Sequence, residues 1–144
     1  MALFKTAIGF ILLGITLEVF WTSVLNSIKT KNPKLTGKTY LWMFPIYALV
    51  PFLYLLVLSQ FQQTNIFIKG IIYMFGFYLL EFTSGYLIKK IVGVSPWDYE
   101  NYSIKIFGKR YTSNFQGLIC IQYAPIWYLY GIFGEFYFKF LINL

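Results

Sequence analysis

Residues 70–88 read Gly-Ile-Ile-Tyr-Met-Phe-Gly-Phe-Tyr-Leu-Leu-Glu-Phe-Thr-Ser-Gly-Tyr-Leu-Ile, an apolar run that carries one carboxylate, Glu81. At about 1.5 Å per residue, a helix of this length nearly spans a hydrocarbon core of about 30 Å. A charged side chain there costs about 2.5 to 3.5 kcal/mol on insertion scales. We therefore expect a membrane-spanning helix and a protein group that pairs with Glu81.

The composition indicates a membrane protein of one domain, residues 1–144. The chain is 58% hydrophobic and only 12% charged, whereas soluble domains are about 45 to 50% apolar and 25% charged. Its net charge of +7 comes mainly from basic residues between the apolar runs, so we ascribe it to membrane topology and expect no nucleic-acid partner. Histidine is absent and Cys120 is the single cysteine. We accordingly predict no metal site and no cofactor.

The apolar runs predict an all-α integral membrane protein, a bundle of four transmembrane helices. No small-residue cleavage pattern follows the first run, so we expect it to be retained as a helix. The second run contains two prolines, Pro45 and Pro51, and is expected to kink. The predicted helices cover about residues 4–28, 40–58, 66–88 and 117–141, and basic loops cover 29–39 and 89–116.

Polar residues on the first and third predicted helices define the candidate site. Gly14, Glu18, Thr22 and Asn26 recur every fourth residue, which places them on one helix face. Lipid would not accept that face, so we expect it in the bundle interior. Helix rise places Glu18 about 15 Å from the inner end of its helix.

Glu81 lies at a similar depth, about 10 Å from the inner end of its own helix. We expect Glu18 and Glu81 to face one another or a shared cavity, with at least one of them protonated or paired. A shared proton, a bound cation or a cage of hydroxyls and amides would relieve the repulsion between the two carboxylates. Lys69 is too far from Glu81 to pair with it, because the two lie about 18 Å apart along the third predicted helix. The nearest candidates for that cage by depth and face are Tyr78, Ser84 and Gln122, and Thr22 is a further buried polar candidate.

A loop follows the third predicted helix and contains Ser95-Pro-Trp-Asp98. This pattern fits a capping box with proline at the first helical position and predicts a short interfacial helix near 95–102. Two interpretations of Pro96, Trp97, Asp98 and Tyr99 stay open. In the first, the aromatic residues form a belt at the headgroup level and Asp98 caps the helix. In the second, Trp97 and Asp98 fold back and close the Glu81 cavity.

Basic residues set the expected topology, because cytoplasmic loops are enriched in lysine and arginine. Nine of the twelve basic residues lie in the first and third loops, so we expect these loops in the cytoplasm and both termini outside. Four of the nine are expected to contact lipid headgroups, namely Lys89, Lys90, Lys109 and Arg110. Glu135 and Lys139, four residues apart, are predicted to form an interfacial pair.

Several of these motifs together carry a family resemblance over nearly the whole chain. Glu81-Phe-Thr-Ser-Gly85, Pro96-Trp-Asp-Tyr99 and Gly117-Leu-Ile-Cys-Ile-Gln-Tyr-Ala124 with Trp127 occur in that order. Through these ordered motifs the sequence resembles the transmembrane protein 229 family, whose bacterial relatives are filed as putative ABC transporter permeases of type IV. The resemblance implies a small multi-pass membrane protein.

Three functions are compatible with the sequence. The first is a non-catalytic subunit or packing module of a larger membrane assembly, with membrane lipids and other membrane-protein subunits as partners. The second is a carrier or lipid-handling protein in which Glu18 and Glu81 bind a cation, a proton or a polar headgroup. The third is an intramembrane enzyme using Glu81 and Asp98 as acid and base, which we disfavour because no nucleophile, histidine or metal cluster supports it.

Overall fold

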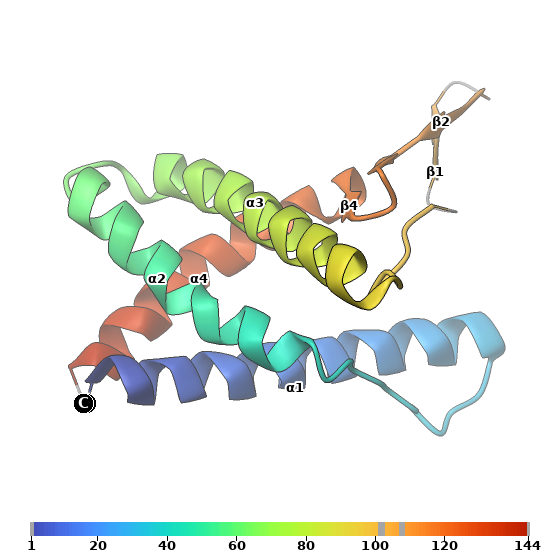
Figure 1. The fold of residues 1–144 in the computed structure, drawn as a ribbon, viewed down its shortest axis with the longest axis horizontal. Coiled ribbons are helices and arrows are strands. Elements are labelled where there is room, and N and C mark those ends of the chain that lie inside the picture. Colours follow the sequence, from blue (N-terminus) through green and yellow to red (C-terminus); the bar gives the residue numbers. More distant parts are fainter. Residues whose placement is uncertain (1, 101–102, 107–108, 144) are drawn as a thin grey trace. The chain divides into compact units, whose positions relative to one another are not determined.

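The computed structural model describes residues 2–100, 103–106 and 109–143, without the side chains of residues 104–106 and 109–111. It is mostly helical (Figure 1). Three of its helices, α1 (Ala2–Thr30), α2 (Met43–Phe61) and α3 (Ile66–Val92), are long and apolar enough to cross a membrane. A fourth helix, α4 (Ala124–Ile142), is not among these three. These features indicate an integral membrane protein, with these three helices as its candidate spans.

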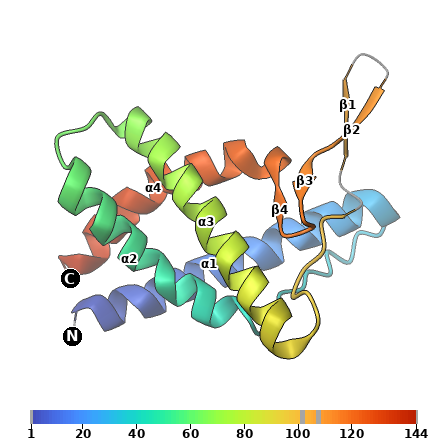
Figure 2. The same cartoon turned by 45° about the horizontal axis from the view of Figure 1, so that its top comes forward.

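Short strands occupy the segment between α3 and α4. Strands β1 (Ser103–Ile106) and β2 (Lys109–Thr112) pair antiparallel, with Lys105 opposite Arg110. This pair extends away from α3 and α4 (Figures 1 and 2). A second antiparallel pair, β3 (Asn114–Phe115) and β4 (Ile119–Cys120), leads through the 3-10 helix η1 (Ile121–Tyr123) into α4. The predicted basic loop 89–116 thus contains strands that its composition did not indicate.

The fourth helix begins seven residues later than predicted, at Ala124 instead of residue 117. Gln116 and Gly117 have φ angles of 52° and 68°, and this left-handed backbone turns the chain between β3 and β4 and stops a helix from passing through it. Pro125 then occupies the first turn of α4, where a residue without an N–H does no harm.

The predicted interfacial helix near 95–102 is wrong over residues 95–100, which are not helical. Residues 101 and 102 lie outside the described residues. The hydroxyl of Ser95 donates to the carbonyl of Trp97 at 2.6 Å, so it does not act as the expected helix cap. The side chains of Trp97 and Tyr99 hold this loop against other elements, as described below.

Helix α2 starts three residues after its predicted start, and Pro45 falls in its first turn. Only Pro51 lies inside the helix, which continues through it. Helix α1 runs to Thr30, and the loop after it returns along the same helix. A Cβ at Gly37 would collide with the carbonyl of Val19, so glycine at this position permits the close approach.

The chain divides into two compact units, Met1–Phe52 with Phe138–Leu144, and Leu53–Tyr137. In the first unit the rings of Phe10 and Phe138 lie 6.5 Å apart. In the second unit the ring of Tyr54 lies 4.7 Å from that of Tyr73 and 6.1 Å from that of Phe77. Organisation as a single domain stays a prediction.

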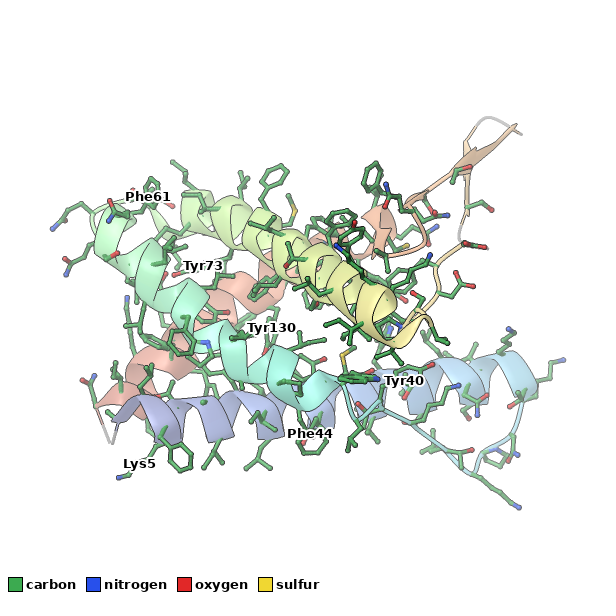
Figure 3. The ribbon with its side chains drawn as sticks, in the orientation of Figure 1. Lys5, Tyr40, Phe44, Phe61, Tyr73 and Tyr130 are labelled. Carbon is green, nitrogen blue, oxygen red and sulfur yellow. The ribbon has the colours of Figure 1, made fainter. Side chains whose placement is uncertain are left out.

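The spanning helices keep most of their apolar surface exposed. Only 22% to 28% of the residues in their most apolar segments are buried. Neighbouring phenylalanines on α3 show the contrast, because Phe75 is 63% exposed and Phe77 is 3% exposed. Figure 3 shows Lys5 of α1 pointing outward, in keeping with its exposed side chain. Lipid or other protein must cover the apolar surface.

Candidate functional site

Each of the three glutamates on the helices accepts a hydrogen bond from a tyrosine. The phenol satisfies a carboxylate oxygen but adds no positive charge, so the negative charge still needs compensation in an apolar setting. The three sites differ in that compensation. The pairs are Glu18 with Tyr47, Glu81 with Tyr99, and Glu135 with Tyr73.

Glu135 on α4 is compensated by a lysine. The Nζ atom of Lys69 on α3 lies 2.6 Å from Oε1 of Glu135, and the hydroxyl of Tyr73, which is labelled in Figure 3, donates to Oε2 at 2.7 Å. Lys69 is 4% exposed and Glu135 is 2% exposed. Glu135 is therefore buried and paired with Lys69, and its predicted interfacial pair with Lys139 stays a prediction.

Helix periodicity and one glycine bring these groups together. Lys69 and Tyr73 are four residues apart on α3 and so share a face. A Cβ at Gly131 on α4 would lie 2.5 Å from the Cβ of Tyr73, which means that only glycine allows the two helices to approach this closely. The close approach places Glu135, four residues after Gly131, opposite both donors.

Glu18 on α1 is half-buried and bound by hydroxyl groups of its own unit. Thr39 donates to its Oε2 at 2.7 Å, and Tyr47 donates to the same atom at 3.5 Å. Gly14, one turn before Glu18, leaves room for the ring of Tyr47, because a Cβ there would collide with it. The loop before α2 and the start of α2 thus shelter Glu18.

The remainder of that helix face is also covered by the loop. The hydroxyl of Thr22 accepts from the backbone N–H of Lys38 at 2.9 Å, and the amide of Asn26 donates to the carbonyl of Thr36 at 3.4 Å. The face expected in the bundle interior therefore lies against residues 36–39. Glu18 and Glu81 belong to different units, and their shared cavity stays a prediction.

Glu81 on α3 is the least compensated of the three. It is 9% exposed, and the hydroxyl of Tyr99 donates to its Oε1 at 2.9 Å. Its Oε2 is buried and has no hydrogen-bond partner among the described residues. No lysine or arginine of the described chain forms an ion pair with it. The indole of Trp127 on α4 is close enough to interact with the carboxylate, but its Nε1 also lacks a hydrogen-bond partner in the part of the chain that the structure describes.

Tyr99 is suited to act as a lasting donor to Glu81. Burial raises the pKa of the Tyr99 phenol above its ordinary value, and the charge of Glu81 raises that pKa further. The phenol therefore keeps its proton at neutral and moderately alkaline pH. Its hydroxyl remains available to donate throughout that range.

Backbone and indole contacts hold the loop that delivers Tyr99. The indole Nε1 of Trp97 donates to the carbonyl of Leu118 at 2.9 Å, and the backbone N–H of Tyr99 donates to the carbonyl of Gly117 at 2.9 Å. A Cβ at Gly85 would lie 3.0 Å from the ring of Trp97, so glycine on α3 makes room for the indole. Pro96 and Trp97 are buried, which places Trp97 inside the protein instead of in a headgroup belt.

Asp98 does not take part in closing the Glu81 site. Its side chain is exposed, and its Oδ1 accepts from the backbone N–H of Glu100 at 2.7 Å. Of the loop residues singled out in the sequence, Tyr99 is the one that reaches the Glu81 carboxylate. Asp98 is also poorly placed to serve as a second catalytic acid or base beside Glu81.

Three further predicted partners of Glu81 make hydrogen bonds elsewhere, and none of these hydrogen bonds involves the Glu81 carboxylate. Tyr78 still lies within electrostatic reach of Glu81. Tyr78 donates to the carbonyls of Cys120 and Ile121. Ser84 donates to the carbonyl of Leu80. Gln122 donates to the carbonyl of Ser103 and the hydroxyl of Ser113.

The predicted headgroup contacts fall at the end of α3 and on β2. Lys89 lines a cleft of about 350 Å³ together with Asp98 and Glu100, and Lys90 is exposed. Lys109 and Arg110 lie on β2, with side chains outside the described residues. In the described part of the chain, no group of three or more histidine, cysteine or acidic residues is placed to hold a metal ion.

Sequence reasoning missed the cluster of Lys69, Tyr73 and Glu135. One signal was available, because Lys69 and Glu135 are opposite charges that each lie in an apolar run. Two such charges at similar depth in different helices are candidates for a pair. Tyr99 was selected as part of the loop motif, but nothing local in the sequence identifies it as the donor to Glu81.

Comparison with known protein families gives a match over nearly the whole chain. A family model described as "Putative ABC-transporter type IV" matches residues 7–143, which is nearly the whole chain. No solved structure matches the chain.

Proposed function

We propose that this chain, which belongs to the putative ABC-transporter type IV family, is a non-catalytic membrane subunit of a larger membrane assembly. The family description names a transport system, and such systems need a source of energy. Residues 1–144 contain no P-loop, so nucleotide hydrolysis would be supplied from outside this segment. Kinship with the transmembrane protein 229 family stays part of this proposal.

The observation that supports the proposal best is the exposed apolar surface of the helices. Lipid can cover such a surface, but so can the helices of partner subunits, and large aromatic side chains on it offer extensive contact area. Exposed phenylalanines occur on each of α1, α3 and α4, for example Phe20, Phe75 and Phe133.

Site-specific photocrosslinking in native membranes would test the proposal. The photoreactive residue benzoylphenylalanine would replace Phe20, Phe75 or Phe133, one at a time, in the full chain. We expect at least one position to crosslink to a second polypeptide at high yield. Phe77, which is buried two residues from Phe75, provides a matched control that should crosslink only within the chain.

Lipid adducts alone at all three exposed positions would contradict the subunit proposal. A crosslinked band that matches a dimer of this chain would also count against it, because the assembly would then contain only one kind of subunit. Mass spectrometry of the crosslinked bands distinguishes these results.

A second function, a carrier or lipid-handling protein using Glu18 and Glu81, is favoured by one specific observation. Oε2 of Glu81 is buried and has no hydrogen-bond partner in the described part of the chain, and an unsatisfied buried oxygen costs about 1 to 3 kcal/mol unless something binds it. Native mass spectrometry of gently purified protein would test this function. A retained solute or lipid that is lost in Glu81→Gln would support it, and an equal complement of bound molecules in both proteins would refute it.

A further inference from the structure

We propose that Glu81 binds and releases a single proton, and that Tyr99 positions its carboxyl group for that exchange. The inference rests on the second of the two functions above, since it names the ligand of the same site. It does not depend on the subunit proposal. The experiment below detects the proton directly, so its failure would leave the crosslinking result unaffected.

Comparison of the five acidic residues of the chain singles out Glu81. Asp98 and Glu100 are exposed to water, where a carboxylate is well solvated. Glu135 is ion-paired with Lys69. Glu18 is only half-buried and accepts two hydrogen bonds from hydroxyls. Glu81 alone combines deep burial with an oxygen that has no partner among the described residues.

The neighbours of Glu81 favour a proton over a metal ion. Hard metal cations such as Ca²⁺ and Mg²⁺ are held by several oxygen ligands, whereas a proton needs only one oxygen. Beside the Glu81 carboxylate lie the hydroxyl of Tyr99 and the indole of Trp127. The indole N–H is a donor that cannot bind a cation through nitrogen. A neutral carboxylic acid would also remove the need for a compensating charge.

Among the described residues, no other group near Glu81 would compete for the proton. The described titratable groups within electrostatic reach are Tyr78 on α3, Tyr99 in the loop and Cys120 at the end of β4. Phenols and thiols are much weaker acids than a carboxylic acid, so they stay protonated while Glu81 titrates. In the described chain no lysine or arginine forms an ion pair with Glu81. A pH-dependent signal from this cluster would therefore arise at Glu81.

Infrared spectroscopy can detect the proton, because a protonated carboxylic acid absorbs at a frequency that a carboxylate does not share. The full chain in lipid vesicles would be titrated through neutral pH. We expect a carboxylic-acid band that persists after the exposed carboxyls have ionised and that disappears as the pH rises further. Glu81→Gln should lack this band. Glu100→Gln, which removes an exposed carboxyl group, is the control and should retain it.

Three results would overturn the proposal. The first is a band that survives in Glu81→Gln, and the second is the absence of such a band in the wild-type protein. Loss of the band at constant pH when sodium chloride replaces choline chloride would also overturn it, because a metal ion would then be the ligand.

Tyr99→Phe keeps the carboxyl group and so tests the site even where Glu81→Gln folds poorly. Removing a hydrogen bond that stabilises the ionised carboxylate should make the proton harder to release. We expect the midpoint of the band's titration to move upward by about one to two pH units. An unchanged midpoint in this variant would show that Tyr99 has no positioning role. Tyr123→Phe, which removes the hydroxyl of a ring packed 5.6 Å from that of Tyr99, should leave the midpoint in place.

Discussion

Removal of the positive charge from Lys69 is the sharpest test of the fold, because Lys69 and Glu135 form a buried ion pair. In Lys69→Met, the carboxylate of Glu135 would keep only the hydrogen bond from Tyr73 among the contacts described above. Breaking a buried pair by removing one partner costs about 3 to 5 kcal/mol, since an uncompensated charge remains. We expect the free energy of unfolding to fall by that amount.

Replacement of both charged residues should be much less harmful. An apolar pair of similar volume avoids the cost of burying charges, so Lys69→Met with Glu135→Leu should recover most of the loss. The hydroxyl of Tyr73 would still lose its acceptor, at about 1 to 3 kcal/mol. Adding Tyr73→Phe removes that remaining penalty, and the triple variant should approach the stability of the wild-type protein.

The assay is reversible unfolding of the full chain in mixed micelles with increasing sodium dodecyl sulfate, followed by circular dichroism. Lys90→Met provides the control, because Lys90 lies on the same helix but is exposed, and its loss should change stability by less than about 0.5 kcal/mol. If Lys69→Met is no more destabilising than Lys90→Met, the ion pair contributes nothing measurable and the reasoning is wrong.

Three further predictions concern topology, surface and packing. Thr64→Cys but not Thr36→Cys should react with an impermeant thiol reagent in intact cells, since the basic loops are expected in the cytoplasm; the reverse labelling would overturn this topology. Lys109→Gln with Arg110→Gln should leave the fold intact while weakening association with anionic lipid by about 1 kcal/mol per residue, and failure to fold would assign these residues a structural role. Gly131→Ala should lower the free energy of unfolding by about 1 to 3 kcal/mol, because its Cβ has no space against Tyr73; stability equal to wild type in the same micelle assay would contradict that contact.

Membrane-spanning helices were predictable because their signal is local and strong. A run of about 20 apolar residues has few alternatives to a helix in a bilayer, where every backbone N–H and C=O must be bonded within the segment. Three such helices are present within a few residues of their predicted bounds. The expectation that Glu81 needs a partner came from the same physics, and Tyr99 is one partner that the structure provides.

The loop after α3 could not be derived in the same way. Ser95-Pro-Trp-Asp98 has the composition of a capping box, and a local pattern cannot show that the indole of Trp97 has a better partner in the carbonyl of Leu118, 21 residues later. Burial of that indole and the hydrogen bond from Tyr99 to Glu81 together outweigh the modest stability of one isolated helical turn. Glu135 is a second case. Its proximity to Lys139 in sequence suggested a pair within one helix, whereas the structure also pairs it with Lys69 on another helix.

The separation between the two carboxylate sites of the second unit makes the role of Glu81 open to experiment. Lys69 and Glu81 are twelve residues apart on α3 and so about 18 Å apart along the helix. The ion pair and the contact between Gly131 and Tyr73 join α3 to α4 at the Lys69 end. Substitutions at Glu81 leave those contacts unchanged, and effects at such a distance usually add independently. A loss of proton binding or of bound solute in Glu81→Gln can therefore be assigned to the carboxyl group, provided that unfolding of the variant still responds to Lys69→Met as in the wild-type protein.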